Sequence, residues 1–437
     1  MHRPGGISTR QSSRQIVFVT LPISRYYLPI DQSVTLCQTR HSTRQLSMYS
    51  KITQFEPLLP SSVPPALLDK AADIATISLR LTAAAHPSAR ATIRELVRSM
   101  NSYYSNRIEG QGTHPQNIER ALHQEFSDKP DIARLQRVAL AHMAAERDLE
   151  HRVLNGQSAL SSHFLLDAHQ ALYSRLAEQD RTTDDGHIIV PGELRHQDVE
   201  VGRHVAPTAA SLPNFLARMD EVYDQSISWD ARLIAIACEH HRAAWVHPFR
   251  DGNGRSVRLQ THCALGNLSE GLWSPSRGLA RSVKDYYARL HNADMPRRGD
   301  LDGRGNLTTA GLNEWIDYFL ELCLDQVNYM SKMLDLDGMK RRIEALVIFR
   351  AMQDKGLRSE AILPLFHVFA AGPVSRGEFT QLTGLGERTS RSLLSRLLST
   401  GLLVSDTALG PVRFGLPLDS LQFLFPELYP EAATNPE

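Results

Sequence analysis

The sequence predicts a mainly α-helical protein: a large helical domain with one small β-hairpin, followed by a winged helix-turn-helix domain. Three observations favour this class. Apolar residues recur at helical spacing from Pro64 onward. After Gly186 the pattern changes to short strand-like runs broken by glycine and proline. After Asp337 a pattern of three helices and two short strands follows.

Each helix is predicted from apolar residues that share one face, as Ile93, Leu96 and Met100 do. In chain order we expect helices at residues 64–85, 88–104, 115–125, 130–154, 161–176, 209–226, 229–246, 254–268, 277–291 and 309–335. Two β-type runs, at 188–190 and 199–201, predict the hairpin.

The last hundred residues predict a separate small domain. A tight Gly384-Leu385-Gly386 turn opens a helix over 387–398, and runs at 402–404 and 411–414 would form the two wing strands. Arginines on that helix and wing could contact DNA phosphates; they are Arg388, Arg391, Arg396 and Arg413. Protein contacts or plain packing are equally compatible with this pattern.

Composition restricts the class of protein. The formal net charge is zero, which gives no general attraction to nucleic acid or an anionic membrane. No apolar run approaches the roughly 20 residues that span a bilayer, so we expect no membrane partner and a cytoplasmic location. The four cysteines form no CxxC pair and predict neither a disulfide framework nor a cysteine zinc site.

The first 47 residues hold six arginines, many Ser and Thr, and a single acid, Asp31. An organelle transit peptide has a similar bias. We favour an unstructured extension, or a chain start assigned upstream of the true start at Met48.

The stretch that carries chemistry is residues 247–258, His-Pro-Phe-Arg-Asp-Gly-Asn-Gly-Arg-Ser-Val-Arg. Pro248 ends the preceding helix just after His247. Gly252 and Gly254 permit positive φ and close backbone approach, so successive N–H groups can form an anion-binding nest. The next helix begins here, and its positive dipole end faces the same anion.

The side chains of this stretch suit phosphoryl-type transfer. Asp251 offers the hard oxygen that Mg²⁺ prefers. Arg255 and Arg258 share a helix face and can bind phosphate with forked hydrogen bonds. His247 can accept a proton from a hydroxyl near neutral pH. Each residue alone would more often belong to a turn or a solvated face, but their combination within twelve residues predicts a catalytic site.

At these residues the chain resembles the Fic family, whose core motif is HxFx(D/E)GNGRxxR, and every specified position matches. The resemblance covers roughly residues 90–330. Residues 192–207 look like the family's target-binding flap, and Tyr286-Tyr287-Ala288-Arg289-Leu290 is similar to its YYxxL segment.

The resemblance implies a helical protein adenylyltransferase, which moves AMP from ATP to a hydroxyl side chain of a target protein docked on the flap. It makes His247 the base, Phe249 an inward-packing anchor, and Asp251 the ligand of Mg²⁺ or Mn²⁺. Phosphate oxygens would contact Gly252, Asn253, Gly254, Arg255 and Arg258. Tyr287 would line the adenine pocket, or else serve packing. Relatives of this kind also form homodimers.

A second match lies upstream, where Ser105-Asn106-Arg107-Ile108-Glu109-Gly110 fits the family's inhibitory pattern (S/T)xxxE(G/N). The resemblance implies that Glu109 pairs with Arg258 and occupies the place of the γ-phosphate. An ordinary helix end with Gly110 as its C-terminal cap is the alternative.

These motifs divide the chain into four expected parts: an extension at 1–50, N-terminal helices with the inhibitory segment at 51–130, the catalytic core at 131–336 and the C-terminal domain at 337–437. The alternative function is a DNA-binding transcriptional regulator whose Fic domain senses nucleotide. Of His240 and His241, which precede the motif, one is expected on the buried face as a hydrogen-bonded core histidine, although their spacing to the motif histidine could also suggest a metal site.

Overall fold

The computed structural model describes residues 49–183, 186–201, 204–223 and 228–429. The chain is mainly α-helical, as predicted. The helices of the larger body are α1 (Pro65–Ala84), α2 (Pro87–Ile108), α3 (Pro115–Leu122), α4 (Pro130–Leu154), α5 (Ser162–Tyr173), α6 (Leu212–Tyr223), α7 (Trp229–Val246), α8 (Asn253–Ser269), α9 (Ser276–Arg281), α10 (Val283–Ala293) and α11 (Thr309–Leu334). The predicted N-terminal extension lies almost wholly outside the described residues.

Proline begins each of the first four helices, α1 to α4. It is favoured there because its fixed φ suits the helix and its missing N–H would have no intrahelical acceptor. Helix α2 continues past the predicted end at Tyr104 to Ile108. Gly110, with φ 71°, then turns the chain. This extra turn places the predicted inhibitory segment at the end of a largely buried helix.

Two expectations for the helices were wrong in detail. The helix predicted at 277–291 is broken at Ser282, whose φ of −137° and ψ of 55° leave the helical region, so α9 and α10 are separate. The helix predicted from residue 209 begins with a 3₁₀ turn, Ala209–Ser211, and becomes α-helical at Leu212.

The predicted hairpin was paired wrongly. Strand β1 (Glu200–Val201) pairs antiparallel with β2 (His204–Val205), not with residues 188–190. Ile188 instead bridges back to Thr182. The physical cause is the turn that follows, where Pro191 cannot donate to a ladder and Gly192 adopts a φ of 77°. The earlier run therefore pairs with the chain before it.

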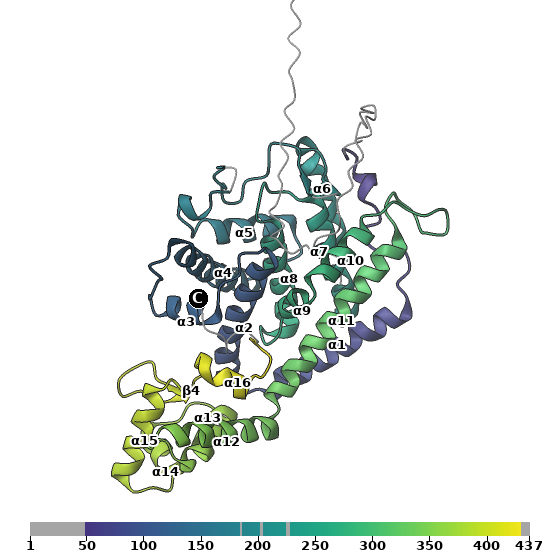
Figure 1. Ribbon diagram of the computed structural model, residues 1–437. Helices are drawn as coiled ribbons and strands as arrows, with labels where there is room; N and C mark the ends of the chain where they lie inside the picture. The colour runs from purple at the N-terminus through teal and green to yellow at the C-terminus, as the bar shows by residue number, and fades with distance from the viewer. Residues whose placement is uncertain (1–48, 184–185, 202–203, 224–227, 430–437) are drawn as a thin grey trace, which may run out of the picture.

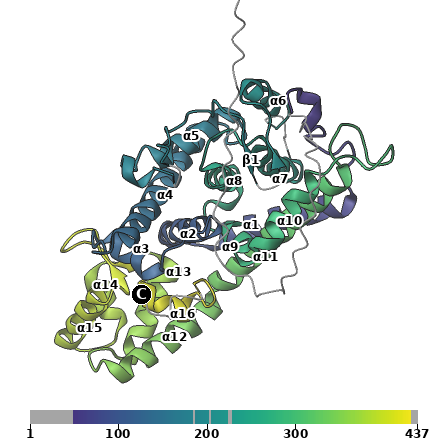
Figure 2. The same cartoon turned by 45° about the horizontal axis from the view of Figure 1, so that its top comes forward.

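Helix α8 runs through the middle of the larger body, with α2, α4, α5 and α7 around it in both views (Figures 1 and 2). Nearly every residue of α8 is buried, including its arginines and His262. Buried charged side chains need partners because an unpaired charge in a protein interior is costly. The neighbouring helices α2 and α4 supply most of those partners.

The C-terminal part consists of α12 (Leu336–Gln353), α13 (Ile362–Ala371), α14 (Arg376–Leu382), α15 (Glu387–Ser399), the hairpin β3 (Leu403–Val404) with β4 (Arg413–Phe414), and α16 (Leu421–Leu424). Four helices precede the hairpin where three were predicted, and the boundary expected at residue 337 falls inside the first turn of α12. The winged-helix assignment stays a prediction.

The end of the described chain returns to the N-terminal helices, where α16 lies below α2 and α3 (Figure 1). The Tyr104 hydroxyl of α2 donates to the Leu428 carbonyl over 2.6 Å. The Tyr429 ring stacks against Tyr104 with its centroid 6.4 Å away. The C-terminal part is thus attached to α2, the helix that leads into the predicted inhibitory segment.

Three of the four arginines predicted to contact DNA form ion pairs within the protein. Arg391 pairs with Glu387 at 2.5 Å, and Arg413 pairs with Asp406 at 2.8 Å. Arg396 pairs with Asp354, the residue that follows α12, at 2.5 Å. Among the described helices, none is both long and apolar enough to cross a membrane. Three of the four cysteines, Cys238, Cys263 and Cys323, are buried and unbridged, as expected.

Candidate active site

The loop between α7 and α8 has a tightly closed backbone. His247 ends α7 in the left-handed region, with φ 49° and ψ 60°. The Asn253 side chain closes the loop with two hydrogen bonds to Phe249: its amide donates to the carbonyl over 2.8 Å, and its oxygen accepts from the N–H over 2.9 Å. The Phe249 ring is fully buried and stacks on His169, 3.9 Å between centroids. The Asn253 side chain is therefore occupied, which leaves its backbone N–H to meet a ligand.

Glycine is required at both positions of this loop. Gly252 caps α8 with a φ of 79°, and a Cβ there would collide with the Tyr173 ring. A Cβ on Gly254 would collide with the Glu109 carboxylate and lie 2.9 Å from Arg258 Nη1. The first N–H groups of α8 have no intrahelical acceptor and carry the positive end of the helix dipole. This geometry suits an anion at the start of α8.

The backbone of His247 is held by a residue that the sequence did not reveal. The buried Arg195 guanidinium donates to the His247 carbonyl over 2.8 Å and to the Pro207 carbonyl over 2.5 Å. Burial, with His204 and Arg195 close by, lowers the pKa of the His247 imidazole to about 3. The imidazole is therefore neutral at ordinary pH, as a proton acceptor must be.

Asp251 lies in the loop two residues before the start of α8, and it is only partly buried. One carboxylate oxygen accepts from the Gly252 N–H over 2.5 Å, and the group lies 4.0 Å from Arg255. The His169 ring contacts the Asp251 carbonyl at 3.2 Å and accepts from the Gly192 N–H over 2.9 Å. One partly exposed carboxylate beside an anion site is what Mg²⁺ needs when phosphates complete its shell.

The two motif arginines point from α8 toward the end of α2. Arg258 is buried; its guanidinium donates to the Ser105 hydroxyl over 2.9 Å, to the Ser105 carbonyl over 3.0 Å, and to Glu109 Oε1 over 2.5 Å. Arg255 donates to Gln111 over 2.9 Å. The predicted contact between Glu109 and Arg258 is thus present, and the carboxylate lies over the first turn of α8.

Tyrosines of α10 complete the surroundings. Tyr287 is 47% exposed, whereas Tyr286 is buried and its hydroxyl lies 2.9 Å from His240 Nε2. His240 also bonds to Thr261 at 2.7 Å. His240 is therefore a hydrogen-bonded core residue, whereas a role of the exposed Tyr287 in an adenine pocket stays a prediction.

Sequence reasoning missed two positioning residues, Arg195 and His169. Both join the segment after Gly192 to the loop, and both line a cavity of about 160 Å³ together with Arg250 and Ile189. A lone Arg or His in a sequence gives no sign of such contacts. Only the fold, which brings residues 169, 195 and 247 together, reveals them.

Comparison with known proteins identifies the region. Residues 159–265 match the Fic/DOC family. The protein adenylyltransferase Fic of Drosophila willistoni is 35% identical over 83 residues, 18% of this chain and 17% of that protein. Its counterpart in Nematostella vectensis is 28% identical over 125 residues, 28% of this chain and 27% of that protein. The matches therefore span less than a third of either relative.

Solved structures of similar proteins include a Fic family protein from Desulfovibrio desulfuricans, with 19% identity and a TM-score of 0.48 over 82% of this chain and 98% of that one. Fic-1 from C. elegans has 18% identity and a TM-score of 0.46 over 61% and 72% of the two chains. The sequence match places the whole His247–Arg258 loop inside the matched region. This chain therefore contains a domain of the Fic/DOC family.

Proposed function

We propose that this protein is an adenylyltransferase that moves AMP from ATP to a hydroxyl side chain of a target protein. The observation that carries the proposal is the loop itself: a neutral imidazole, a helix N-terminus suited to an anion, and two buried arginines beside it. The loop lies within residues 159–265, which match the Fic/DOC family, and parts of this chain are similar to the adenylyltransferases named above.

The reaction follows from the roles of these residues. A nitrogen of His247 accepts the proton of the target hydroxyl, whose oxygen bonds to the α-phosphorus of ATP. The bond from that phosphorus to the bridging oxygen breaks, and pyrophosphate leaves. The backbone N–H groups of Gly252, Asn253 and Gly254, with Arg255 and Arg258, hold the phosphates and stabilise the charge of the leaving group.

Asp251 would hold Mg²⁺ or Mn²⁺, which supplies further neutralisation of phosphate charge when bound. The exposed Tyr287 would stack on the adenine. The target would dock on the flap, residues 192–207, where strand addition to β1–β2 recognises main chain and tolerates many sequences. The cavity beside His169 and Arg195 supports an occupant at this position.

We further propose that Glu109 inhibits the enzyme. Its carboxylate pairs with Arg258 and covers the start of α8, where the γ-phosphate would bind. Triphosphate must displace this carboxylate, and the two negative groups repel each other. ATP that binds beside Glu109 would lie in a pose unsuited to attack.

The test is transfer of label from ATP that is labelled at the α-phosphate. The Glu109→Gly protein is incubated with cell extract, and modified proteins are identified by mass spectrometry. We expect a mass shift of AMP on a hydroxyl residue, and none with Glu109→Gly/His247→Ala. The proposal would be overturned if the histidine variant transferred as much label, or if label were transferred only from ATP that is labelled at the γ-phosphate. No contact in the described structure favours DNA binding, so we make no second proposal.

A further inference from the structure

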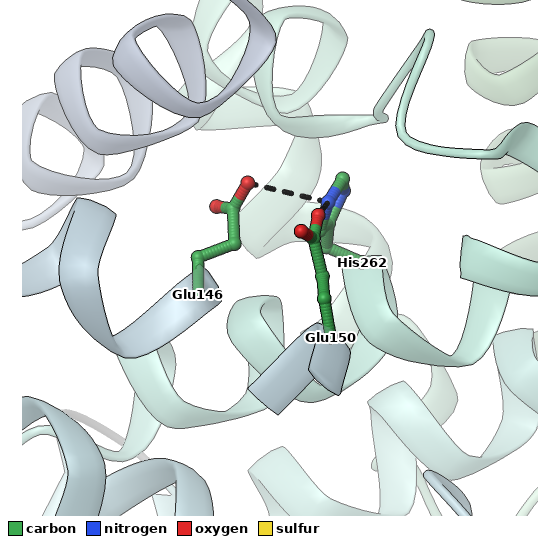
Figure 3. A group of neighbouring side chains, drawn as sticks. All are labelled: Glu146, Glu150 and His262. Carbon is green, nitrogen blue, oxygen red and sulfur yellow. Dashed lines mark hydrogen bonds and ion pairs between the residues drawn. The ribbon is translucent and has the colours of Figure 1, made fainter. Parts of the chain in front are cut away.

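Three side chains, two of them buried and one partly buried, converge between α4 and α8, away from the loop described above (Figure 3). Glu146 and Glu150 lie one turn apart on α4, and His262 lies one turn beyond Arg258 on α8. The Glu146 and His262 side chains are 1% and 3% exposed, and the Glu150 side chain is 18% exposed. Nothing in the proposed transfer reaction uses these residues.

The donor atoms of the group are placed like the ligands of a metal ion. His262 Nε2 lies 3.2 Å from Glu146 Oε1 and 3.1 Å from Glu150 Oε1. All three ligand atoms lie within 4.8 Å of one another. In a tetrahedral zinc site with bonds of about 2.0–2.1 Å, neighbouring ligand atoms are roughly 3.3 Å apart. Both measured edges are close to that value.

Further side chains hold the two carboxylates in place. Arg98 of α2 pairs with the other oxygen of Glu150, Oε2. The Asn101 amide donates to both oxygens of Glu146, over 3.1 and 3.2 Å. Carboxylates that bind metals are commonly oriented by such outer hydrogen bonds. Each glutamate thus keeps one oxygen directed at His262 while a residue of α2 fixes its orientation.

An independent observation also points to a ligand. His142, one turn before Glu146 on α4, is 1% exposed, and neither of its ring nitrogens has a hydrogen-bond partner among the described residues. Its Nδ1 lies 4.0 Å from Glu146 Oε2. A buried imidazole without a partner is costly. A metal ion, or a water bound to that ion, would provide the missing partner.

We propose that Glu146, Glu150 and His262 bind one divalent transition-metal ion, with zinc the best match to two carboxylate oxygens and one imidazole. Imidazole favours zinc over magnesium, and the two carboxylates balance its charge. The ion joins α4 to α8 and, through Arg98 and Asn101, to α2. This site is separate from Asp251 and does not depend on AMP transfer. Its role is to hold together the helices that carry Glu109 and Arg258.

The test measures zinc bound to the full-length protein after dialysis against EDTA. Titration with Zn²⁺, followed by calorimetry and elemental analysis, should give one equivalent for wild type. Glu146→Gln and His262→Gln should each weaken binding at least tenfold, because each removes a ligand. Glu95→Gln, which alters a carboxylate that contacts Arg98 outside the group, is the matched control and should bind as wild type does.

A second variant separates this site from the proposed magnesium site. Asp251→Asn should keep the full equivalent of zinc. Zinc at a hundredfold excess over its Kd should also raise the melting temperature of wild type by about 3 °C, with no shift in Glu146→Gln. The proposal is wrong if wild type binds no zinc in the titration, if Glu146→Gln and His262→Gln bind it as tightly as wild type, or if only Asp251→Asn loses it. In those cases a protonated His262 between two carboxylates accounts for the group.

Discussion

Replacing Glu109 by glycine should turn a slow transferase into a fast one. In the present structure its carboxylate accepts from Arg258 over 2.5 Å and covers the first turn of α8. Glycine removes that group and leaves α2, which ends at Ile108, in place. Arg258 keeps its two hydrogen bonds to Ser105 and gains room to bind the γ-phosphate.

The size of the effect follows from the burial of the pair. The Arg258 side chain is 2% exposed and that of Glu109 is 22% exposed, so water screens the contact little. A hydrogen bond between charged groups of this kind contributes about 1.5–3 kcal/mol. Productive ATP must overcome that amount, and each 1.36 kcal/mol is a tenfold change in rate. We expect AMP transfer to rise by roughly ten- to a hundredfold.

The assay is incorporation of label from α-labelled ATP into the enzyme itself and into the identified target. Glu109→Gln is the matched variant: it keeps the length of the side chain and one acceptor but removes the charge, so its gain should be smaller. Glu109→Gly/His247→Ala should be inactive. If Glu109→Gly melts at the wild-type temperature and transfers AMP no faster, the contact with Arg258 serves stability, and the inhibitory role is refuted.

Three further outcomes follow from single contacts. Because the pKa of His247 is about 3, its imidazole stays neutral, and kcat/KM should remain flat from pH 8 to pH 6. A histidine with the ordinary pKa of about 6.5 would lose about three quarters of the rate over this range. Such a loss would contradict the assignment of a low pKa to His247. Arg195→Lys keeps the positive charge, but a lysine cannot donate to the three backbone carbonyls that the arginine guanidinium contacts at once. Denaturant titration should therefore show a loss of about 2–3 kcal/mol in the free energy of unfolding. Tyr104→Phe removes the bond to the Leu428 carbonyl and should cost about 1 kcal/mol in the same titration; an unchanged midpoint would show that this attachment contributes nothing.

Much of the fold was predictable because its signals are local. Proline at the start of a helix and apolar residues on one face fix α1, α4, α7 and α11 to within a residue or two. The hairpin was mispaired because the sequence shows which runs favour strands but not which run each one meets. Pairing of short strands depends on the turn between them, and Pro191-Gly192 directs the chain elsewhere.

The candidate site was predictable only where its residues are consecutive. The loop 247–258 carries its own turn chemistry, so the roles of its backbone could be inferred from glycine and proline alone. Arg195, His169 and the group around His262 act through contacts between distant segments. A buried arginine or glutamate looks in sequence like any solvated one, since partners separated by a hundred residues leave no local pattern.

The attachments of α2 bear on how inhibition could be relieved. Arg98 and Asn101 tie its middle to α4, and Tyr104 ties its next turn to the C-terminal segment. Displacing the whole helix would break all of these contacts, whereas Glu109 sits at the helix end before Gly110, which adopts a φ of 71°. Rotation of one partly exposed side chain costs far less than undocking a buried helix. We therefore expect an ATP analogue to leave amide exchange in the middle of α2 unchanged, and faster exchange there on binding would show that the helix itself moves.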